Sequence, residues 1–227
     1  MKTLGIVGGI APPSTIEYYR SIVDIHRNRA NRPPRVLINS VDGDVVLGHL
    51  TAGRHTDLVA ALLEAVRQLA SAGAELALLA SISAHIAFDD VRAATPLPLI
   101  DIVEATAGAV ADFKRLGLFA TRFTMQADLF GPTLASRGIS TVAPTADEQE
   151  TIDGVYFDEL VAGQFLPASR DRLLAIGARL RAEEHIEAIL LGGTELPLLL
   201  PMASHEGLVY LDICRIHADA AVTAMLA

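Results

Sequence analysis

The chain has 227 residues, of which 51% are apolar and 20% charged, and its formal net charge at pH 7 is −9. This composition supports a substantial core in one large or two small α/β domains and argues against disorder. The acidic balance disfavours nucleic acid as a main partner, because phosphate binding needs clustered lysine and arginine.

Short apolar segments alternate along the chain with longer segments that carry apolar residues at three- and four-residue spacing. The segments predicted as strands are 3–7, 36–40, 76–80, 99–100, 116–120, 140–142, 188–191 and 208–211. The first predicted helix begins near Ser14, which has capping-box spacing to Glu17, and Pro12 and Pro13 suit a helix entrance. The other predicted helices are 57–72, 102–114, 127–137, 147–162, 167–184 and 213–226. Such alternation predicts parallel sheet flanked by helices on both faces.

A repeat underlies this pattern. The strand that starts at Gly5 has a counterpart at Gly117, and 117 − 5 is 112 residues; Ser81 corresponds to Gly193 at the same offset, 193 − 81. The repeat predicts two similar α/β lobes, with lobe one formed by 1–97 plus 208–227 and lobe two by 98–207. Parallel sheets bind ligands beyond the carboxyl ends of their strands, so we expect an active-site cleft between the lobes.

In lobe one, three strands are followed by polar or glycine-rich segments. Gly9 belongs to a glycine pair that suits either an anion site or a tight turn without a ligand. Ser81, Ser83 and His85 lie at one strand-to-helix corner, where Ser83 suits either a ligand contact or an N-cap, and His85 either a functional or a structural role. Asp42 follows another strand in a polar loop, and the last predicted helix contains His217.

In lobe two, two strand ends carry similar groups. Thr121, Arg122 and Thr124 precede a helix, where hydroxyls and backbone amides suit anion capture or N-capping. After the other strand come Gly193, Thr194 and Glu195. A buried carboxylate at this place is costly unless it has a partner, so Glu195 is either a functional acid or base or half of a structural pair.

The sequence also limits cofactors and setting. No metal-ligand cluster, P-loop or nucleophile elbow occurs, so we expect no metal site. Cys214 is the single cysteine and is expected to be a buried core residue at the start of the last helix. The N-terminal segment lacks the features of a signal peptide, and no apolar run reaches membrane-spanning length, so we expect a cytoplasmic protein that does not bind membranes.

Five segments together resemble the aspartate/glutamate racemase family over essentially the whole chain. They are Gly5-Ile6-Val7-Gly8-Gly9 with the following Tyr18-Tyr19-Arg20, Ser83-Ala84-His85, Gly117-Leu118 with 121–125, 152–163, and Leu191-Gly192 with Thr194-Glu195-Leu196-Pro197. The resemblance implies two α/β lobes related by a pseudo-twofold axis, in a protein that is commonly dimeric. It also implies racemisation of a small amino acid, without cofactor or metal, by two cysteines on opposite faces of the α-carbon.

The chain departs from the family pattern where those cysteines are expected. Ser81 stands at the first cysteine position and Gly193 at the second. A serine hydroxyl is a far weaker acid than a thiol, and glycine has no side chain, so two-thiol racemisation is not expected. On this interpretation, Gly193 enlarges one wall of the site.

Three functions remain open. The first is an enzyme acting on a small carboxylate or amino acid as a lyase, decarboxylase, isomerase or cyclase, with His85, Glu195, Ser81 and Asp42 as catalytic candidates. Its substrate-binding candidates are Gly9, Ser83, Thr121, Arg122, Thr124, Gly193 and Thr194. The second is a one-sided amino-acid racemase or epimerase, and the third is a carboxylate-binding protein without catalysis.

Overall fold

A computed structural model of the protein describes residues 1–200 and 203–227, and it divides the chain into two compact units. Unit 1 comprises Met1–Ala105 and Arg215–Ala227, and unit 2 comprises Thr106–Cys214. The chain therefore leaves unit 1, builds the whole of unit 2, and returns to unit 1 with its last helix.

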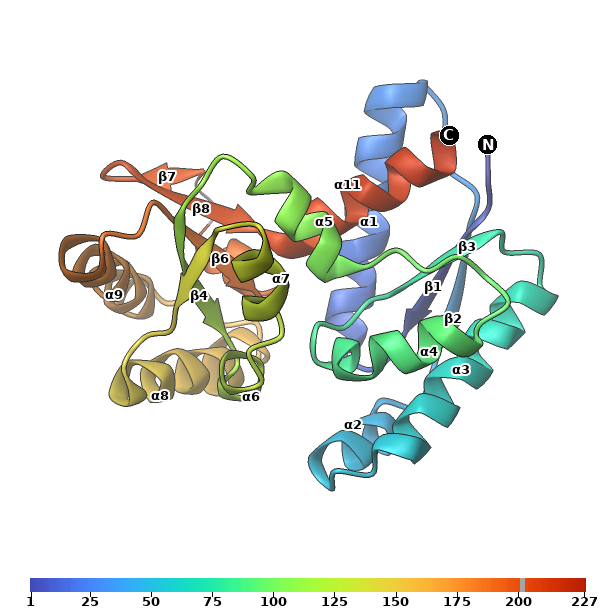
Figure 1. Ribbon diagram of the computed structural model, residues 1–227, viewed down its shortest axis with the longest axis horizontal. Helices are drawn as coiled ribbons and strands as arrows, with labels where there is room; N and C mark the ends of the chain where they lie inside the picture. Colours follow the sequence, from blue (N-terminus) through green and yellow to red (C-terminus); the bar gives the residue numbers. More distant parts are fainter. Residues whose placement is uncertain (201–202) are drawn as a thin grey trace. The chain divides into compact units, whose positions relative to one another are not determined.

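Unit 1 is a three-stranded parallel sheet with helices around it (Figure 1). The strand order is β2-β1-β3, with β1 in the centre. Its elements in chain order are β1 (Leu4–Gly8), α1 (Pro12–Ala30), β2 (Val36–Ser40), α2 (Gly43–Thr51), α3 (His55–Ser71), β3 (Leu76–Leu79), the 3-10 helix η1 (Ser83–Ala87), α4 (Phe88–Ala94) and, from Arg215 onward, α11 (Ile213–Leu226). Helix α5 (Ile102–Ala109) carries the chain into unit 2.

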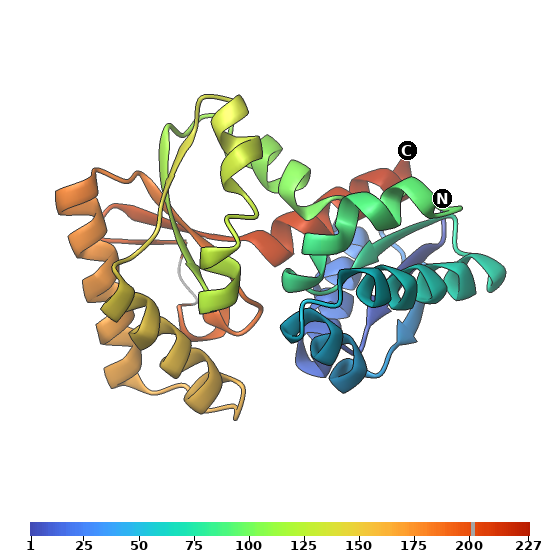
Figure 2. The ribbon, with the colours of Figure 1, turned by 60° about the horizontal axis from the view of Figure 1, so that its bottom comes forward.

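The core of unit 1 follows from the alternation of side chains along β1. Val7 packs in a cluster with apolar residues of α3 and α4. An added Cβ at Gly5, on the same face, would lie 3.1 Å from Leu69 Cδ1, so this glycine lets α3 approach the sheet. Helices α1 and α11 lie side by side, joined by the ion pair between Arg29 and Asp219 at 2.5 Å (Figures 1 and 2).

Unit 2 contains a five-stranded sheet in the order β5-β4-β6-β8-β7, in which only β7 is antiparallel to its neighbour. Its elements in chain order are β4 (Arg115–Ala120), α6 (Arg122–Gln126), α7 (Gly131–Ser136), β5 (Ser140–Val142), α8 (Ala146–Gly154), the π-helical turn η2 (Val155–Leu160), α9 (Pro167–Glu184), β6 (Ala188–Gly192), α10 (Leu196–Leu199), β7 (Ser204–His205) and β8 (Leu208–Asp212).

The two sheets bear out the sequence repeat. The order β2-β1-β3 of unit 1 corresponds to β5-β4-β6 of unit 2, and β1 and β4 contain the two matching segments. Glycine is used alike in both, since an added Cβ at Gly117 would meet Ile186 Cδ1 at 2.9 Å, as one at Gly5 meets Leu69. At Gly5 the small residue admits helix α3, and at Gly117 it admits Ile186, which lies between α9 and β6.

The lobe boundaries differ from the expected ones. The last strand does not return to lobe one, because β8 pairs in parallel with β6 in the second sheet. Only α11 returns, so unit 2 ends at Cys214 and not at residue 207, and it begins at Thr106 and not at residue 98. The expected strand 99–100 is a single bridge between Ala77 and Leu99.

Two helix starts also differ. Helix α1 begins at Pro12 after the N-cap Ala11, so the prolines do form the helix entrance, as expected, but the expected capping box of Ser14 and Glu17 is wrong. Proline needs no amide partner in a first turn, which explains why this helix starts without a side-chain cap. Of the predicted helix 127–137, only Gly131–Ser136 is helical, as α7, because Asp128 has a positive φ of 47° that interrupts the helix; α6 (Arg122–Gln126) ends before the predicted start.

Candidate functional site

The glycine turn after β1 is held by internal contacts. Gly9 has a φ of +88°, and an added Cβ would lie 2.4 Å from the carbonyl oxygen of Val41. Its backbone N–H donates to Thr15 Oγ1 at 2.9 Å. Because this amide already has a partner, the contacts favour the tight turn over an anion site at Gly9.

The Asp42 side chain is hydrogen-bonded to the backbone at the start of helix α2. Its Oδ1 accepts hydrogen bonds from the backbone amides of Asp44 at 3.1 Å and Val45 at 3.2 Å, so it is the N-cap of α2. The segment expected as a polar loop therefore begins a helix, and capping accounts for the carboxylate without a catalytic role.

Ser81, Ser83 and His85 do lie together after β3. The two serine hydroxyls are 3.2 Å apart, and His85 Nδ1 lies 2.8 Å from the carbonyl oxygen of Ser81. A carbonyl only accepts, so Nδ1 carries the proton and donates to it. His85 therefore contacts the backbone of Ser81 and does not activate its hydroxyl. Ser83 is not an N-cap, since the N-cap of η1 is Ile82 and no side chain caps it.

The other nitrogen of His85 is the unusual feature of unit 1. Nε2 is buried and has no hydrogen-bond partner among the described residues. A buried acceptor without a partner costs roughly 1–3 kcal/mol. The ring stacks on Phe88 at 5.1 Å and meets His217 edge to face at 5.6 Å. Burial lowers the pKa of His85 to about 4, so the imidazole is neutral at pH 7 with a bare lone pair on Nε2.

At the end of β4, hydroxyls and backbone amides satisfy one another. Thr121 is the N-cap of α6 and accepts from the backbone amide of Thr124, and the two hydroxyls are 3.1 Å apart. The backbone amide of Arg122 donates to Asp153 Oδ1 at 2.8 Å, and the Arg122 side chain is exposed. These contacts agree with the capping alternative for Thr121.

The space beside Gly193 is filled. An added Cβ at this position would lie 2.5 Å from Tyr156 Cε2 and 3.1 Å from the Tyr156 hydroxyl. The expectation that Gly193 enlarges the wall is therefore wrong: the ring of Tyr156, which comes from the π-helical turn η2, occupies the place into which a side chain at 193 would project. π-Helical turns are frequent at functional sites.

Glu195 is the buried acceptor of this group. Its Oε2 accepts a hydrogen bond from the Tyr156 hydroxyl and another, at 2.8 Å, from Thr194 Oγ1. Burial, together with the Glu195 carboxylate, raises the pKa of Tyr156, so the phenol stays protonated and acts as the donor. The expected partner for Glu195 thus exists, and it is a neutral hydroxyl pair and not a cation.

Two side chains of these groups were not among the residues singled out as a site. Tyr156 contacts Glu195 across 39 residues of sequence. Tyr18, in α1, hydrogen-bonds His217 across 199 residues. Both lie in segments that resemble family motifs, and that was the available signal.

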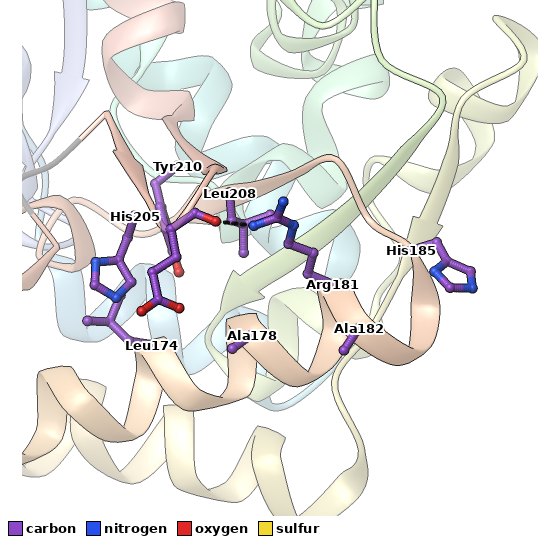
Figure 3. A pocket seen from close by; sticks show the side chains of 9 residues that line it. Leu174, Ala178, Arg181, Ala182, His185, His205, Leu208 and Tyr210 are labelled. Carbon is purple, nitrogen blue, oxygen red and sulfur yellow. Dashed lines mark hydrogen bonds between the residues drawn. The ribbon is translucent and has the colours of Figure 1, made fainter.

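A separate hollow of about 370 Å³ lies between α9 and the β7–β8 hairpin (Figure 3). Its floor includes Leu174 and Ala178, and Arg181 at its rim donates to the backbone carbonyl of Glu206. The hollow extends to His185, just before β6, and therefore lies at the amino end of that strand. Ligands of parallel sheets bind at the opposite end, so this hollow is not the candidate site.

Within residues 1–200 and 203–227, no group of three or more His, Cys, Asp or Glu side chains is placed to hold a metal ion. None of the helices in this part of the chain is long and apolar enough to span a membrane. Cys214 is buried, as expected of a core residue.

Comparisons with known proteins agree with this fold. A family model described as Asp/Glu/Hydantoin racemase matches residues 7–221. A proposed Asp/Glu racemase from Yersinia pestis is 29% identical with a TM-score of 0.91, and an aspartate racemase homologue from Pyrococcus horikoshii is 29% identical with a TM-score of 0.86; each match covers 100% of both chains. An uncharacterized protein from Pectobacterium carotovorum subsp. carotovorum is 32% identical over 120 residues, which are 50% of this chain and 75% of that one. The expected two-lobed α/β fold with flanking helices is confirmed.

Proposed function

Because the chain belongs to the Asp/Glu/hydantoin racemase family, we propose that it is an enzyme for a small carboxylate or amino acid that does not use two thiols. It works without a cofactor, and its proton-transfer groups are His85 in unit 1 and Glu195 in unit 2. The reaction is a lyase, decarboxylase, isomerase or cyclase step that begins or ends with a proton at carbon.

The observation that carries this proposal is the group formed by Gly193, Tyr156 and Glu195. The family resemblance places a cysteine at 193, but here the Tyr156 ring occupies the space that its side chain would need. In place of a thiol, this group contains the Glu195 carboxylate, whose Oε2 accepts hydrogen bonds from two hydroxyls. A lost function would not need such a hydrogen-bonded group, so its presence favours a changed chemistry over a merely vacant position.

Unit 1 supports the same conclusion with a different group. Ser81 stands where the resemblance places the other cysteine, and no described contact activates its hydroxyl, which pairs with Ser83. The neighbouring His85 has an unprotonated Nε2. A neutral imidazole with a lowered pKa is a weak base, but all of it is in the base form at pH 7.

The test is product analysis with matched variants. The protein is incubated with L- and D-aspartate, L- and D-glutamate, small dicarboxylates and hydantoins, and products are identified by NMR and mass spectrometry. His85→Asn and Glu195→Gln are expected to lower kcat on the converted compound by roughly 10²–10⁴-fold, the usual contribution of a general acid or base.

Buried residues of the same types serve as controls. His26→Asn changes a histidine that is fully buried in unit 1 and bonded to the backbone of Arg32. Tyr210→Phe changes a buried tyrosine of unit 2, to be compared with Tyr156→Phe. Equal losses in controls and site variants, or no conversion of any compound by the folded protein, would contradict the proposal.

One-sided racemisation or epimerisation is the second candidate, and the bare Nε2 of His85 favours it. A single base, here His85, can remove an α-proton and return one from solvent, so this exchange needs neither of the two family thiols. Incubation with L-aspartate and L-glutamate in deuterated water should then diminish the α-proton signal, and His85→Asn should abolish that exchange. An α-proton signal that persists through long incubation rejects this candidate for these two amino acids.

A further inference from the structure

Two buried imidazoles lie side by side in unit 1, and their nitrogens have different partners. His85 and His217 are 4% and 0% exposed, and their ring centroids are 5.6 Å apart. In His217, Nε2 lies 2.9 Å from the carbonyl oxygen of Ile100, and Nδ1 lies 2.9 Å from the Tyr18 hydroxyl. In His85, Nδ1 contacts the Ser81 carbonyl, and Nε2 has no partner within the described part of the chain.

The partners determine where the protons are. The Ile100 carbonyl only accepts, so His217 carries its proton on Nε2 and its Nδ1 is a bare lone pair. The Tyr18 hydroxyl must then donate to Nδ1. Tyr18 is 2% exposed and its ring meets His217 edge to face at 5.6 Å, so this donor is fixed by packing.

The charged groups near the pair include Asp101 and Arg92. Asp101 is the acidic neighbour whose charge acts on His85, and its Oδ1 accepts from the amide of Val103 at the start of α5. Arg92 lies 3.7 Å from Asp101 and 2.7 Å from Asp89, and its guanidinium lies over Phe88, the ring that stacks on His85. Burial of both imidazoles opposes a positive charge on either, and a charge on one opposes a charge on the other.

We propose that Tyr18 is a positioning residue which, by occupying the lone pair of His217, leaves His85 Nε2 as the atom of this imidazole pair that takes up a proton. This inference rests on the proposed role of His85 as the base. A hydrogen bond donated to the neutral form of an imidazole disfavours its protonation. His217 is thereby kept neutral, while His85 Nε2 has no donor among the described residues and can accept a proton.

The test follows the imidazole nitrogens of the whole protein by ¹H–¹⁵N NMR between pH 7 and the acid limit of folding. His85→Gln assigns the two sets of signals. In the unchanged protein, we expect the proton on Nδ1 of His85 and on Nε2 of His217, and His85 is protonated first as the pH falls. In Tyr18→Phe, which keeps the ring, the midpoint of His217 should rise by about one pH unit or more, and His85 should no longer be protonated first.

The matched control is Tyr19→Phe, because Tyr19 is the next residue in α1 and is 46% exposed. It should leave both titrations unchanged. Protonation of His217 before His85 in the unchanged protein overturns the proposal, as does an unmoved His217 midpoint in Tyr18→Phe. The order of protonation in the unchanged protein tests the proposal even where the variant does not fold. No substrate is used, so these outcomes are independent of whether the proposed activity is found.

Discussion

Gly193 and Tyr156 depend on each other for space. The ring of Tyr156 lies where any larger residue at 193 would place its Cβ, and the same ring carries the hydroxyl that holds Glu195. A change at either position therefore alters the position of the carboxylate, so the three residues are best tested together.

Gly193→Ala is expected to destabilise the protein by about 1–3 kcal/mol, the usual cost of overpacking a filled site. Combining it with Tyr156→Ala should cost less than the sum of the two single changes, because the second change removes the atoms that clash. Urea denaturation of the single and double variants measures this coupling. Gly108→Ala, where an added Cβ meets nothing within 4 Å, is the control and should not destabilise. Strict additivity would show that Tyr156 moves aside freely.

Restoring the two thiols needs a third change. Ser81→Cys with Gly193→Cys should gain no racemase activity over the unchanged protein while Tyr156 keeps its ring, since the new side chain at 193 has no room. Adding Tyr156→Ala makes that room, and we expect measurable interconversion of L- and D-aspartate by polarimetry. Equal activity in the double and triple variants would contradict the steric argument.

At the residue scale, the sequence singled out side chains whose hydrogen-bond partners it could not identify. Glu195 was predicted to need a partner, and it has one. The identity of that partner, Tyr156, was not predictable from spacing, because the contact joins a π-helical turn to a strand end that is far away in the sequence. For the same reason, Gly193 was interpreted as an open position.

At the scale of elements, helix α8 and the turn η2 determine where Tyr156 lies. Helix α8 begins with a capping box, in which Thr145 accepts from the amide of Glu148 and the Glu148 side chain accepts from the amide of Thr145. Arg179 of α9 also binds Glu148, and this ion pair helps to lower the pKa of that carboxyl against the effect of its partial burial. One glutamate thus fixes the helix start and ties two helices together.

Thr145→Ala should lower the free energy of unfolding by about 1 kcal/mol, the typical value of an N-cap. Thr151→Ala is the control in the same helix, because its exposed hydroxyl donates only to the carbonyl of Asp147 one turn earlier. Thermal or urea unfolding of both variants measures the difference. An equal effect of the two changes would mean that the cap does not determine where α8 starts.

Periodicity predicted the long elements well and the short ones poorly. Helices α9 and α11 have the expected bounds, as do strands β2 and β5. Helix α2 was missed because its start, Asp42 with Gly43, has the composition of a polar loop, although Asp42 is a good N-cap. The short α4 and α10 and the hairpin strand β7 have too few residues for a period to show.

At the scale of the whole molecule, the buried histidines are unevenly divided. Those that the structure describes as buried are His26, His85 and His217, and all three belong to unit 1. Burial lowers the pKa of His85 to about 4, and burial together with the charge of His85 lowers that of His217 to about 3. Acid should therefore affect the two units differently.

The folded forms of His85 and His217 bind protons less readily than unfolded histidine, whose pKa is about 6.5. Their contribution to the free energy of unfolding is therefore fully present above pH 6.5 and is lost as the pH falls toward 4. For His85 alone, the loss is about 3 kcal/mol. Hydrogen exchange followed by mass spectrometry should show unit 1 losing protection between pH 6.5 and 4.5, with unit 2 unchanged. His85→Asn should reduce this pH dependence, and equal loss in both units would contradict it.

The return of α11 to unit 1 has a consequence for the order in which the two units can fold during synthesis. Unit 2 is contiguous, so all of its residues have been made once the ribosome has passed Cys214. Unit 1 is started first but must wait for Arg215–Ala227, and with them for His217, before its core can close. Domains generally fold as units during translation, with the N-terminal one first. Here the N-terminal unit cannot complete its core before the last segment of the chain is made, so the usual order does not apply to unit 1.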